Sequence, residues 1–180
     1  MKIAVVGKMR SGKDTLAKFF IDNDNSNQIA FGDEIKKVAK TYFPEIVAKG
    51  KPRKLYQDIG QQFRAIDPHV WVKALDRTIN NLQAVGETNF VISDVRQMNE
   101  YEYLKANGFT VIKVECADEL RKERIIQSGD IFEPNDFYHE TETTVDIIPF
   151  DYLVTNNTTL LDFYDQIQDI YNELRGEQHD

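Results

Sequence analysis

Residues 3–15 read Ile-Ala-Val-Val-Gly-Lys-Met-Arg-Ser-Gly-Lys-Asp-Thr, and this stretch decides the fold. Its first four residues form an apolar run that breaks into a loop bounded by Gly7 and Gly12, and a segment with helical spacing of apolar residues follows. The spacing Gly7-x4-Gly12-Lys13 between a strand and a helix is typical of a phosphate-binding loop. The glycines let backbone N–H groups turn toward an anion, and the helix N-terminus adds partial positive charge. The stretch therefore predicts a nucleotide-binding loop.

The residues that end this loop refine the prediction. Lys13 is expected to reach the β- and γ-phosphates of a nucleoside triphosphate. Asp14 stands where the motif usually has Ser or Thr, whose hydroxyl binds Mg²⁺, and a carboxylate is also a hard oxygen ligand for that ion. Thr15 supplies a hydroxyl one residue later, at a position suited to the α-phosphate. The alternative is an ordinary glycine-containing turn with a chance lysine, and the flanking strand and helix argue against it.

The composition indicates one globular domain in a reducing compartment. The chain has 180 residues, of which 41% are hydrophobic and 29% charged, as is ordinary for a globular protein. No apolar run approaches the ~20 residues of a membrane span, and the first residues lack the pattern of a signal peptide. The single cysteine, Cys116, lies in an apolar run, so we expect a buried, unreactive thiol and no disulfide. We therefore expect a cytoplasmic protein without a membrane partner.

The charge distribution favours a small phosphorylated ligand as partner. The net charge of −8 argues against a nucleic-acid polymer, which needs a basic face. Three basic islands remain within the acidic background, namely Lys8/Arg10/Lys13, Lys49/Lys51/Arg53/Lys54 and Arg121/Lys122/Arg124. Solvated surface charge is the alternative interpretation of each island. The 11 Phe and 8 Tyr residues are enough to leave an apolar patch, so a homodimer stays open.

Short apolar runs alternate along the chain with segments of helical spacing. We expect strands at 2–6, 27–31, 89–93, 110–115 and 152–155, and helices at 13–23, 33–43, 54–66, 70–83, 98–107, 118–127 and 159–174. Strands that alternate with helices pair in parallel, which predicts an α/β three-layer fold with a central parallel sheet of about five strands. Residues 1–180 then form one domain with a helical insertion at about 32–84. Residues 128–150 look irregular, and we expect a small lid over about 118–150.

A second group of polar residues follows the apolar run at 89–93. Asp94 takes the position of a carboxylate that holds Mg²⁺ or orients a phosphate acceptor. Arg96 lies two residues further on and is able to reach the same site. By itself Asp94 could equally be a turn residue. Its place after a strand of the sheet that carries the predicted phosphate loop favours the functional interpretation.

The predicted insertion carries candidate ligands for an acceptor. Lys36 and Arg64 lie on expected helices, where Arg suits bidentate phosphate binding and Lys supplies a point charge. Either side chain could instead belong to a solvated helix face. For Trp71 we expect packing between helices, with stacking on a nucleobase as the lesser alternative.

Arg121 and Arg124 lie three residues apart on one face of an expected helix. Cations in a lid helix are suited to neutralising a transferred phosphoryl group, whose oxygens carry spread negative charge in the transition state. Pairing with Asp118 or Glu119 on the same helix is an alternative of equal weight.

Together these features resemble the deoxynucleoside monophosphate kinases of bacteriophages, a branch of the P-loop kinases, over nearly the whole chain. The matching motifs are Arg-Ser-Gly-Lys-Asp-Thr at 10–15, Phe-Gly-Asp-x-x-Lys at 31–36, Gly60…Arg64…Asp67-Pro68…Trp71, Ser-Asp-Val-Arg at 93–96 with Asn99-Glu100, His139-Glu140-x-Glu142, and Leu153-Val154-x-Asn156-Asn157. The Gly-Lys-Asp-Thr form of the loop is fairly specific, because most P-loop proteins keep Ser or Thr at its third position.

The resemblance implies transfer of the γ-phosphoryl group from Mg·ATP to a (deoxy)nucleoside monophosphate, which gives the diphosphate. The residues implied in ATP binding are Gly7, Arg10, Ser11, Gly12, Lys13, Asp14, Thr15, Asn156 and Asn157, the last two near the adenine. Those implied in acceptor binding are Asp33, Lys36, Arg64, Trp71, Asp94 and Arg96. The implied catalytic residues are Lys13, Asp94, Arg121 and Arg124, and the implied Mg²⁺ ligands are Asp14 and Asp94.

Two other functions remain open at this point. A kinase of another small phosphorylated acceptor, such as phosphomevalonate, would share the ATP site and differ in the acceptor site. A nucleotide-binding regulatory module would bind the nucleotide without turnover. If a phage encodes the chain, as the resemblance implies, we expect it in the host cytoplasm.

Overall fold

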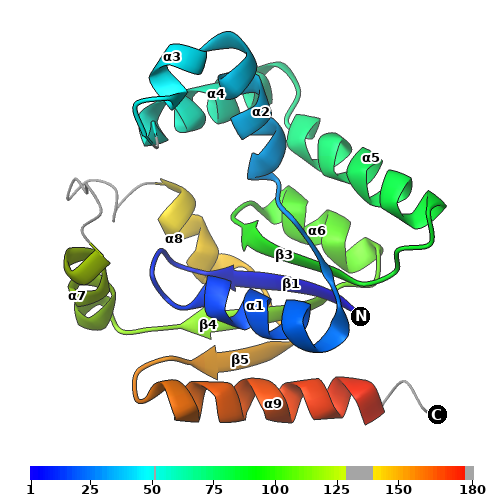
Figure 1. Cartoon of the computed structure of the whole chain (residues 1–180), viewed down its shortest axis with the longest axis vertical. Coiled ribbons are helices and arrows are strands. Elements are labelled where there is room, and N and C mark those ends of the chain that lie inside the picture. Colours follow the sequence, from blue (N-terminus) through cyan, green and yellow to red (C-terminus); the bar gives the residue numbers. More distant parts are fainter. Residues whose placement is uncertain (51, 129–139, 177–180) are drawn as a thin grey trace. The chain divides into compact units, whose positions relative to one another are not determined.

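The computed structural model describes residues 1–50, 52–128 and 140–176. The chain divides into two compact units. The first, which we call the sheet unit, comprises Met1–Gln28 and Asn89–Asp180, and the second, the helical unit, comprises Ile29–Thr88. Figure 1 labels the helices of both units and the strands β1, β3, β4 and β5.

The sheet has five strands, as the sequence predicts. They are β1 (Lys2–Gly7), β2 (Asn27–Ile29), β3 (Phe90–Val95), β4 (Thr110–Glu115) and β5 (Tyr152–Thr155). Their order is β2-β3-β1-β4-β5, and the pairing is parallel throughout. The chain therefore runs from central β1 to the β2 edge, returns through β3 and crosses β1 to reach β4. Such a reversal of direction opens a crevice at the carboxyl ends of the central strands, where α/β sheets bind ligands.

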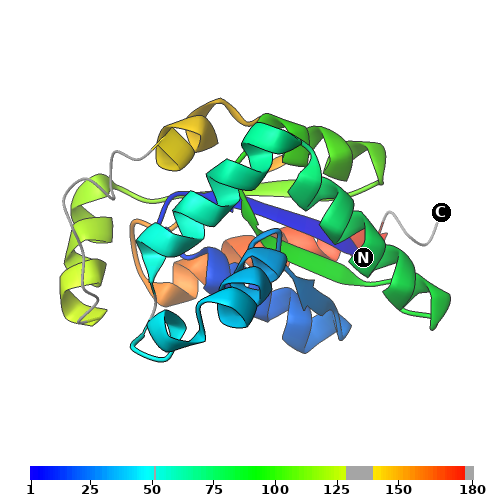
Figure 2. The same ribbon diagram turned by 90° about the horizontal axis from the view of Figure 1, so that it is seen from above.

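Helices cover both faces of this sheet, which confirms the three-layer α/β fold. Helices α1 (Lys13–Asp24) and α9 (Leu160–Gly176) lie on one face, and α6 (Met98–Ala106) and α8 (Glu140–Ile147) lie on the other (Figures 1 and 2). Helix α7 (Asp118–Ser128) follows β4.

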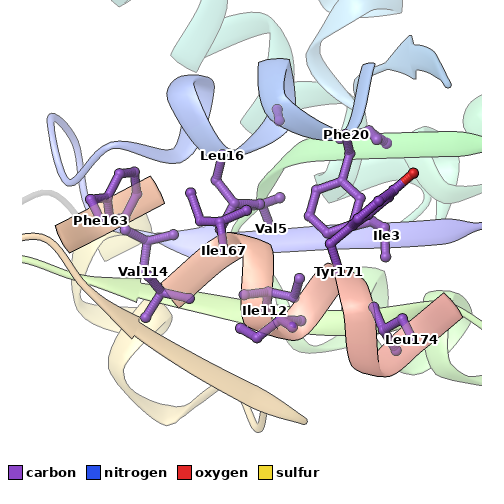
Figure 3. Close-up of a cluster of buried hydrophobic side chains, with 14 residues drawn as sticks. Ile3, Val5, Leu16, Phe20, Ile112, Val114, Phe163, Ile167, Tyr171 and Leu174 are labelled. Carbon is purple, nitrogen blue, oxygen red and sulfur yellow. The ribbon is translucent and has the colours of Figure 1, made fainter. Parts of the chain in front are cut away.

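The main core of the sheet unit lies between the sheet and the helices α1 and α9. Leu16 and Phe20 of α1 meet a row of α9 side chains at helical spacing (Figure 3), which comprises Phe163, Ile167, Tyr171 and Leu174. Alternate strand residues supply the other side, among them Ile3, Val5, Ile112 and Val114. Each large apolar side chain buried in this way contributes about 1.5–3 kcal/mol. The core fixes the start of α1, and with it the end of the predicted phosphate loop.

The helical unit contains α2 (Gly32–Tyr42), α3 (Pro44–Val47), α4 (Arg53–Ile66) and α5 (Val70–Ala84). Its own small core consists of Ile35, Ala39, Ile59 and Trp71. The sequence predicted three helices here, and the structure adds the short α3, which starts at a proline suited to the first helical position.

The prediction that residues 128–150 are irregular is wrong for Glu140–Ile147, which form α8. Thr-rich and β-branched, this segment shows no clear apolar stripe. It forms a helix because its end docks on the sheet unit, where Val145 and Ile148 are each 1% exposed. Residues 129–139, which belong to the predicted lid, lie outside the described residues. No helix in the described part of the chain is long and apolar enough to span a membrane.

Candidate active site

The loop between β1 and α1 has the backbone of an anion-binding turn. Arg10 and Gly12 have positive φ angles of 63° and 113°, and α1 begins directly after Gly12. Left-handed residues alternating with others form a concave array of N–H groups, called a nest, that binds anions. Arg10 carries a Cβ, so its left-handed backbone costs about 1–2 kcal/mol. The surroundings of the loop must offset this strain.

Gly7 and Gly12 leave no room for a side chain. A Cβ on Gly7 would lie 2.7 Å from both Ser11 Oγ and the carbonyl oxygen of Val114. A Cβ on Gly12 would overlap with Asn156 Nδ2. Close packing of the loop against β4 and the segment after β5 thus accounts for both glycines of the predicted motif.

Lys13, Ser11 and Asp14 supply polar groups to the loop and the first turn of α1. Lys13 Nζ donates to the Lys8 carbonyl at 2.7 Å, which folds the lysine side chain back over the loop. Ser11 is 1% exposed, and its hydroxyl has no hydrogen-bond partner within the described chain. A buried unpaired hydroxyl costs about 1–3 kcal/mol, which fits a site that a ligand completes. Asp14 is exposed in the first turn of α1, where the helix dipole favours an anion.

The two arginines of α7 bind carbonyl groups of this loop. Arg121 is 2% exposed; its Nη1 donates to the Met9 carbonyl at 3.1 Å and its Nη2 to Asp118 Oδ1 at 2.8 Å. Arg124 Nη1 donates to the Arg10 carbonyl at 3.3 Å. The pairing with Asp118, one of the two sequence alternatives, is therefore present for Arg121. Contact with a transferred phosphoryl group stays a prediction for both arginines.

The segment after β5 meets the loop from another side. Asn156 is 8% exposed, and its Nδ2 donates to the Ser11 carbonyl at 2.8 Å. Arg124 Nη2 reaches both the Asn156 carbonyl, at 3.1 Å, and Asn156 Oδ1, at 3.2 Å. Asn157 Oδ1 accepts from the Ala117 N–H at 2.7 Å. Two expected ATP ligands thus bind the protein backbone, and no sequence signal could have identified their partners.

A pocket of about 310 Å³ adjoins the loop at the carboxyl end of β4. Its lining includes Gly7 and Lys8 of the loop, Cys116 and Ala117 after β4, and Asp146 of α8. Lys8 Nζ pairs with Asp146 at 2.9 Å. One of the three cations of the first basic island is therefore balanced by α8, which the sequence did not indicate.

Electrostatics in this region follow from the two α7 arginines. The hydrogen bond from Arg121 holds the pKa of the Asp118 carboxyl below its ordinary value. Burial raises the pKa of the Cys116 thiol, against the opposing effect of nearby Arg124. Cys116 is free and half-buried rather than fully buried, and its Sγ accepts from Arg124 Nη1 at 3.2 Å. A raised pKa favours the protonated thiol, which is the less reactive form, and the lack of reactivity expected from the sequence stays a prediction.

Asp94 lies at the carboxyl end of β3, next to the irregular part of its pairing with β1. The register shifts between Ala4 and Val6, so that β3 contains one extra residue before Val95. An insertion of this kind bends a strand and re-aims its side chains. Asp94 is half-buried there, at the same edge of the sheet as the loop.

Arg96 follows β3 and is held by the start of α6. Its backbone N–H donates to Glu100 Oε2 at 2.8 Å, and the Gln97 N–H donates to the same oxygen at 3.1 Å. Gln97 and Glu100 form a reciprocal capping box at this helix end. The cap fixes the backbone from which the half-buried Arg96 side chain projects.

The remaining expected acceptor ligands belong to the helical unit. Asp33 Oδ2 accepts from the Ala30 N–H at 2.9 Å, and Lys36 pairs with Asp33 at 3.0 Å on the exposed start of α2. Arg64 is half-buried beside Gly60. Trp71 is 3% exposed and its Nε1 donates to the Gly60 carbonyl at 3.1 Å. The indole thus takes part in packing, as the sequence favoured, and its acceptor contact stays a prediction.

Metal ligands are sparse in the described residues. These contain no group of three or more His, Cys, Asp or Glu side chains placed to hold a metal ion. Mg²⁺ in kinases needs no such cage, because one or two carboxylates, phosphate oxygens and water complete its shell. Asp14 and Asp94, on α1 and β3 of one unit, suit that donor set.

The family follows from the sequence match. The family model described as deoxynucleotide monophosphate kinase matches residues 51–167, which is more than half of the chain. The chain belongs to this family. It is a kinase that phosphorylates a nucleotide, as the sequence resemblance implied. No curated protein matches the chain.

Solved structures support the kinase fold independently. A gluconokinase from Sinorhizobium meliloti 1021 superposes with a TM-score of 0.62 at 15% identity, with 99% of this chain and 95% of that chain covered. A dephospho-CoA kinase from Campylobacter jejuni gives 0.57 at 14% identity, with 98% and 100% covered. A shikimate kinase from Aquifex aeolicus gives 0.52 at 19% identity, with 99% and 98% covered. At these identities the likeness concerns the fold alone.

Proposed function

We propose that this kinase uses ATP as donor and a deoxynucleoside monophosphate as acceptor. The observation that carries the proposal is the loop between β1 and α1. Arg10 and Gly12 have left-handed backbones there, and neither Gly7 nor Gly12 has room for a Cβ. Left-handed residues that alternate with others turn backbone N–H groups toward one concave surface, which is suited to an anion. The triphosphate of ATP is the anion that this loop suits best.

The proposed roles at the donor side follow from position. Lys13 places its ammonium on the β- and γ-phosphates after leaving the Lys8 carbonyl, to which it is bonded at 2.7 Å. Ser11 and Thr15 supply hydroxyl groups, and the Asn156–Asn157 segment contacts the adenine. The positive end of α1 favours the negative charge of the phosphates throughout.

The proposed magnesium ligands are Asp14 and Asp94. When bound, Mg²⁺ supplies charge neutralisation between the β- and γ-phosphates. The two carboxylates suit a hard cation, and neither side chain belongs to the hydrophobic core.

The proposed acceptor ligands are Asp33, Lys36, Arg64, Trp71 and Arg96. An acceptor phosphate oxygen attacks the γ-phosphorus, the bond from that phosphorus to the β–γ bridging oxygen breaks, and ADP leaves with the electron pair. Arg64 and Arg96 hold the acceptor phosphate, because two phosphate groups repel each other unless cations lie between them. Asp94 orients the acceptor as well as the metal.

We further propose a cytoplasmic enzyme, in the host cytoplasm if a phage encodes it, that acts on small molecules and forms a homodimer. The single, half-buried cysteine suits a reducing compartment. The net charge of −8 disfavours nucleic-acid polymers as partners. Size-exclusion chromatography with light scattering tests the dimer.

Formation of ADP from Mg·ATP, measured against a panel of ribo- and deoxynucleoside monophosphates, tests the main proposal. Phosphomevalonate and a reaction without acceptor are the controls. We expect turnover with at least one deoxynucleotide. Turnover with phosphomevalonate alone would assign the rival acceptor, and ATP binding without any turnover would favour a regulatory module.

Replacing the loop lysine tests the donor site directly. For Lys13→Ala we expect a loss in kcat on the order of 10²–10³, as for removal of one preorganised donor, with the fold intact by circular dichroism. Lys18→Ala is the matched control, since Lys18 lies on the same helix and pairs with Asp22 on the surface. Near-wild-type activity of Lys13→Ala would contradict the assignment.

A further inference from the structure

Four consecutive carbonyl groups of the phosphate loop each accept a hydrogen bond from a side chain. The pairs are Lys8 with Lys13 Nζ at 2.7 Å, Met9 with Arg121 Nη1 at 3.1 Å, Arg10 with Arg124 Nη1 at 3.3 Å, and Ser11 with Asn156 Nδ2 at 2.8 Å. Three of these donors come from outside the loop, two from α7 and one from the segment after β5. All belong to the sheet unit.

The bonded carbonyls determine where the loop N–H groups point. A carbonyl and the N–H of the next residue share one rigid peptide plane and point in opposite directions. A side chain that holds the carbonyl of residue 9, 10 or 11 on one side therefore turns the N–H of residue 10, 11 or 12 to the other. The Ser11 N–H donates to the Lys8 carbonyl at 3.2 Å, which closes the turn.

The two terminal nitrogens of Arg124 are fully used in this arrangement. Its Nη1 reaches the Arg10 carbonyl and Cys116 Sγ, and its Nη2 reaches the carbonyl and the Oδ1 of Asn156. A guanidinium has two N–H groups on each terminal nitrogen, so all four have an acceptor. Binding of a phosphate by these nitrogens would require breaking contacts that hold the loop and the segment after β5.

We propose that Arg121, Arg124 and Asn156 are positioning residues, which fix the phosphate loop in its anion-binding conformation before the nucleotide arrives. The inference rests on the proposed function, since the anion is the triphosphate of ATP. It also explains how Arg10 keeps a left-handed backbone, because its carbonyl is bonded by Arg124 and its own guanidinium donates to Ser128 Oγ at 2.9 Å. Helix α7 thereby acts through the loop, and its arginines need no contact with the transferred phosphoryl group.

The test uses the nucleotide-free full chain and the variants Arg124→Met and Arg124→Lys. Lys122→Met is the matched control, since it removes one positive charge from an exposed position of the same helix. Amide exchange by NMR is measured at Ser11, whose N–H is bonded within the loop, and at Leu16, whose N–H bonds the Gly12 carbonyl in α1 at 3.1 Å. Affinity for inorganic triphosphate is measured by calorimetry without metal.

We expect Ser11 exchange to be about tenfold faster or more in both Arg124 variants, as for loss of charge-assisted hydrogen bonds. Leu16 exchange stays unchanged, triphosphate affinity falls by a similar factor, and Lys122→Met resembles the wild type. The lysine variant does not rescue the loop, because one ammonium cannot span the Arg10 and Asn156 carbonyls.

Two results would overturn the proposal. Unchanged Ser11 exchange with weakened triphosphate binding would make Arg124 a direct phosphate ligand, and rescue of affinity by lysine would support that role. If both Ser11 amide exchange and triphosphate affinity are unchanged in the variants, Arg124 has no role in the loop. If Arg124→Met also accelerates amide exchange at Leu16, the substitution has disturbed α1 as well as the loop. The conservative variants Arg124→Lys and Asn156→Asp then test the proposal, and amide exchange at Ser11 is measured in Asn156→Asp too. Failure of every monophosphate as substrate would refute the proposed function and leave the loop measurement standing.

Discussion

The phosphate loop and the helical unit hold their functional groups in different ways. In the loop the backbone is the proposed binding surface, and buried side chains such as Arg121 and Asn156 hold its carbonyl groups. In the helical unit a small core around Trp71 holds the helices. There the expected ligands are side chains, with Lys36 exposed and Arg64 half-buried.

This difference predicts how each region responds to amino-acid substitutions. A backbone site depends on the space around each Cα, so a single methyl group can abolish it. A side-chain site loses only the contact that is removed, and its specificity can change by substitution without change of the fold. We therefore expect loop substitutions to act on all reactions of the enzyme and substitutions in the helical unit to act on the acceptor.

The largest effect is expected for Gly12→Ala, with Gly86→Ala as its counterpart in the helical unit. Both glycines have positive φ, 113° and 94°, so alanine is strained at either by about 1–2 kcal/mol. Only at Gly12 does the Cβ also meet Asn156, whereas no described atom lies within 4 Å of a Cβ at Gly86. We expect Gly12→Ala to lose kcat/KM on the order of 10²-fold or more and Gly86→Ala to keep it.

Steady-state kinetics and thermal unfolding of the two glycine variants separate strain from steric overlap. Equal loss of activity in both would mean that backbone strain, wherever it lies, impairs the enzyme. Retained activity in Gly12→Ala would show that the loop tolerates a side chain and is not the close-contact site.

A smaller and more selective effect is expected for Arg64→Ala. Loss of a guanidinium from a phosphate raises the KM for the monophosphate by about 10- to 100-fold, while the KM for ATP stays the same. Arg77→Ala is the control, because Arg77 is an exposed arginine of the same unit. An equal rise in both KM values would count against an acceptor role for Arg64. It would also contradict the expectation that substitutions in the helical unit act on the acceptor alone.

Trp71→Phe tests whether the indole does more than pack. Phenylalanine keeps a ring against Phe63, whose ring centre lies 5.3 Å from that of Trp71, and removes the bond to the Gly60 carbonyl. We expect about 1 kcal/mol less stability in urea unfolding followed by circular dichroism, with both KM values unchanged. A raised KM for the monophosphate at unchanged stability would instead place the indole at the acceptor.

Much of the fold is encoded in local patterns of the sequence. The apolar runs of β1, β3 and β4 and the helical spacing of α1 and α9 are visible without structure, because burial on one side leaves a period in the sequence. The loop is predictable too, since Gly7, Gly12 and Lys13 occur at fixed spacing. Helix α8 was missed because it forms through docking of Val145 and Ile148, which a local pattern does not record.

The partners of side chains were less predictable than their positions. The spacing of Arg121 and Arg124 correctly gives a shared helix face, yet nothing in it reveals that loop carbonyls face those arginines. The sequence does not identify which backbone carbonyl accepts such a hydrogen bond, because every residue carries a carbonyl group. Interactions between a side chain and a distant backbone are therefore invisible until the fold brings them together.

The smallest effect is expected for Asp118→Asn, which removes the charge that faces Arg121 behind the loop. Asp118 Oδ1 lies 2.8 Å from Arg121 Nη2, and Arg121 is buried while Asp118 is largely exposed. The arginine lowers the pKa of Asp118 in the folded protein, so the stabilisation is complete above the pKa of the unfolded chain and disappears as the pH falls through the lowered folded value. We expect Asp118→Asn to lower the free energy of unfolding by less than about 1 kcal/mol near neutral pH, since solvent screens the exposed partner.

Thermal unfolding at a series of pH values tests this prediction, and the stabilities of the wild type and the variant should converge in acid. ATP affinity at neutral pH should fall only slightly, because Arg121 still bonds the Met9 carbonyl. A stability difference that persists at the lowest pH would mean that the carboxyl acts by shape rather than by charge, and the support of the loop would then rest on packing.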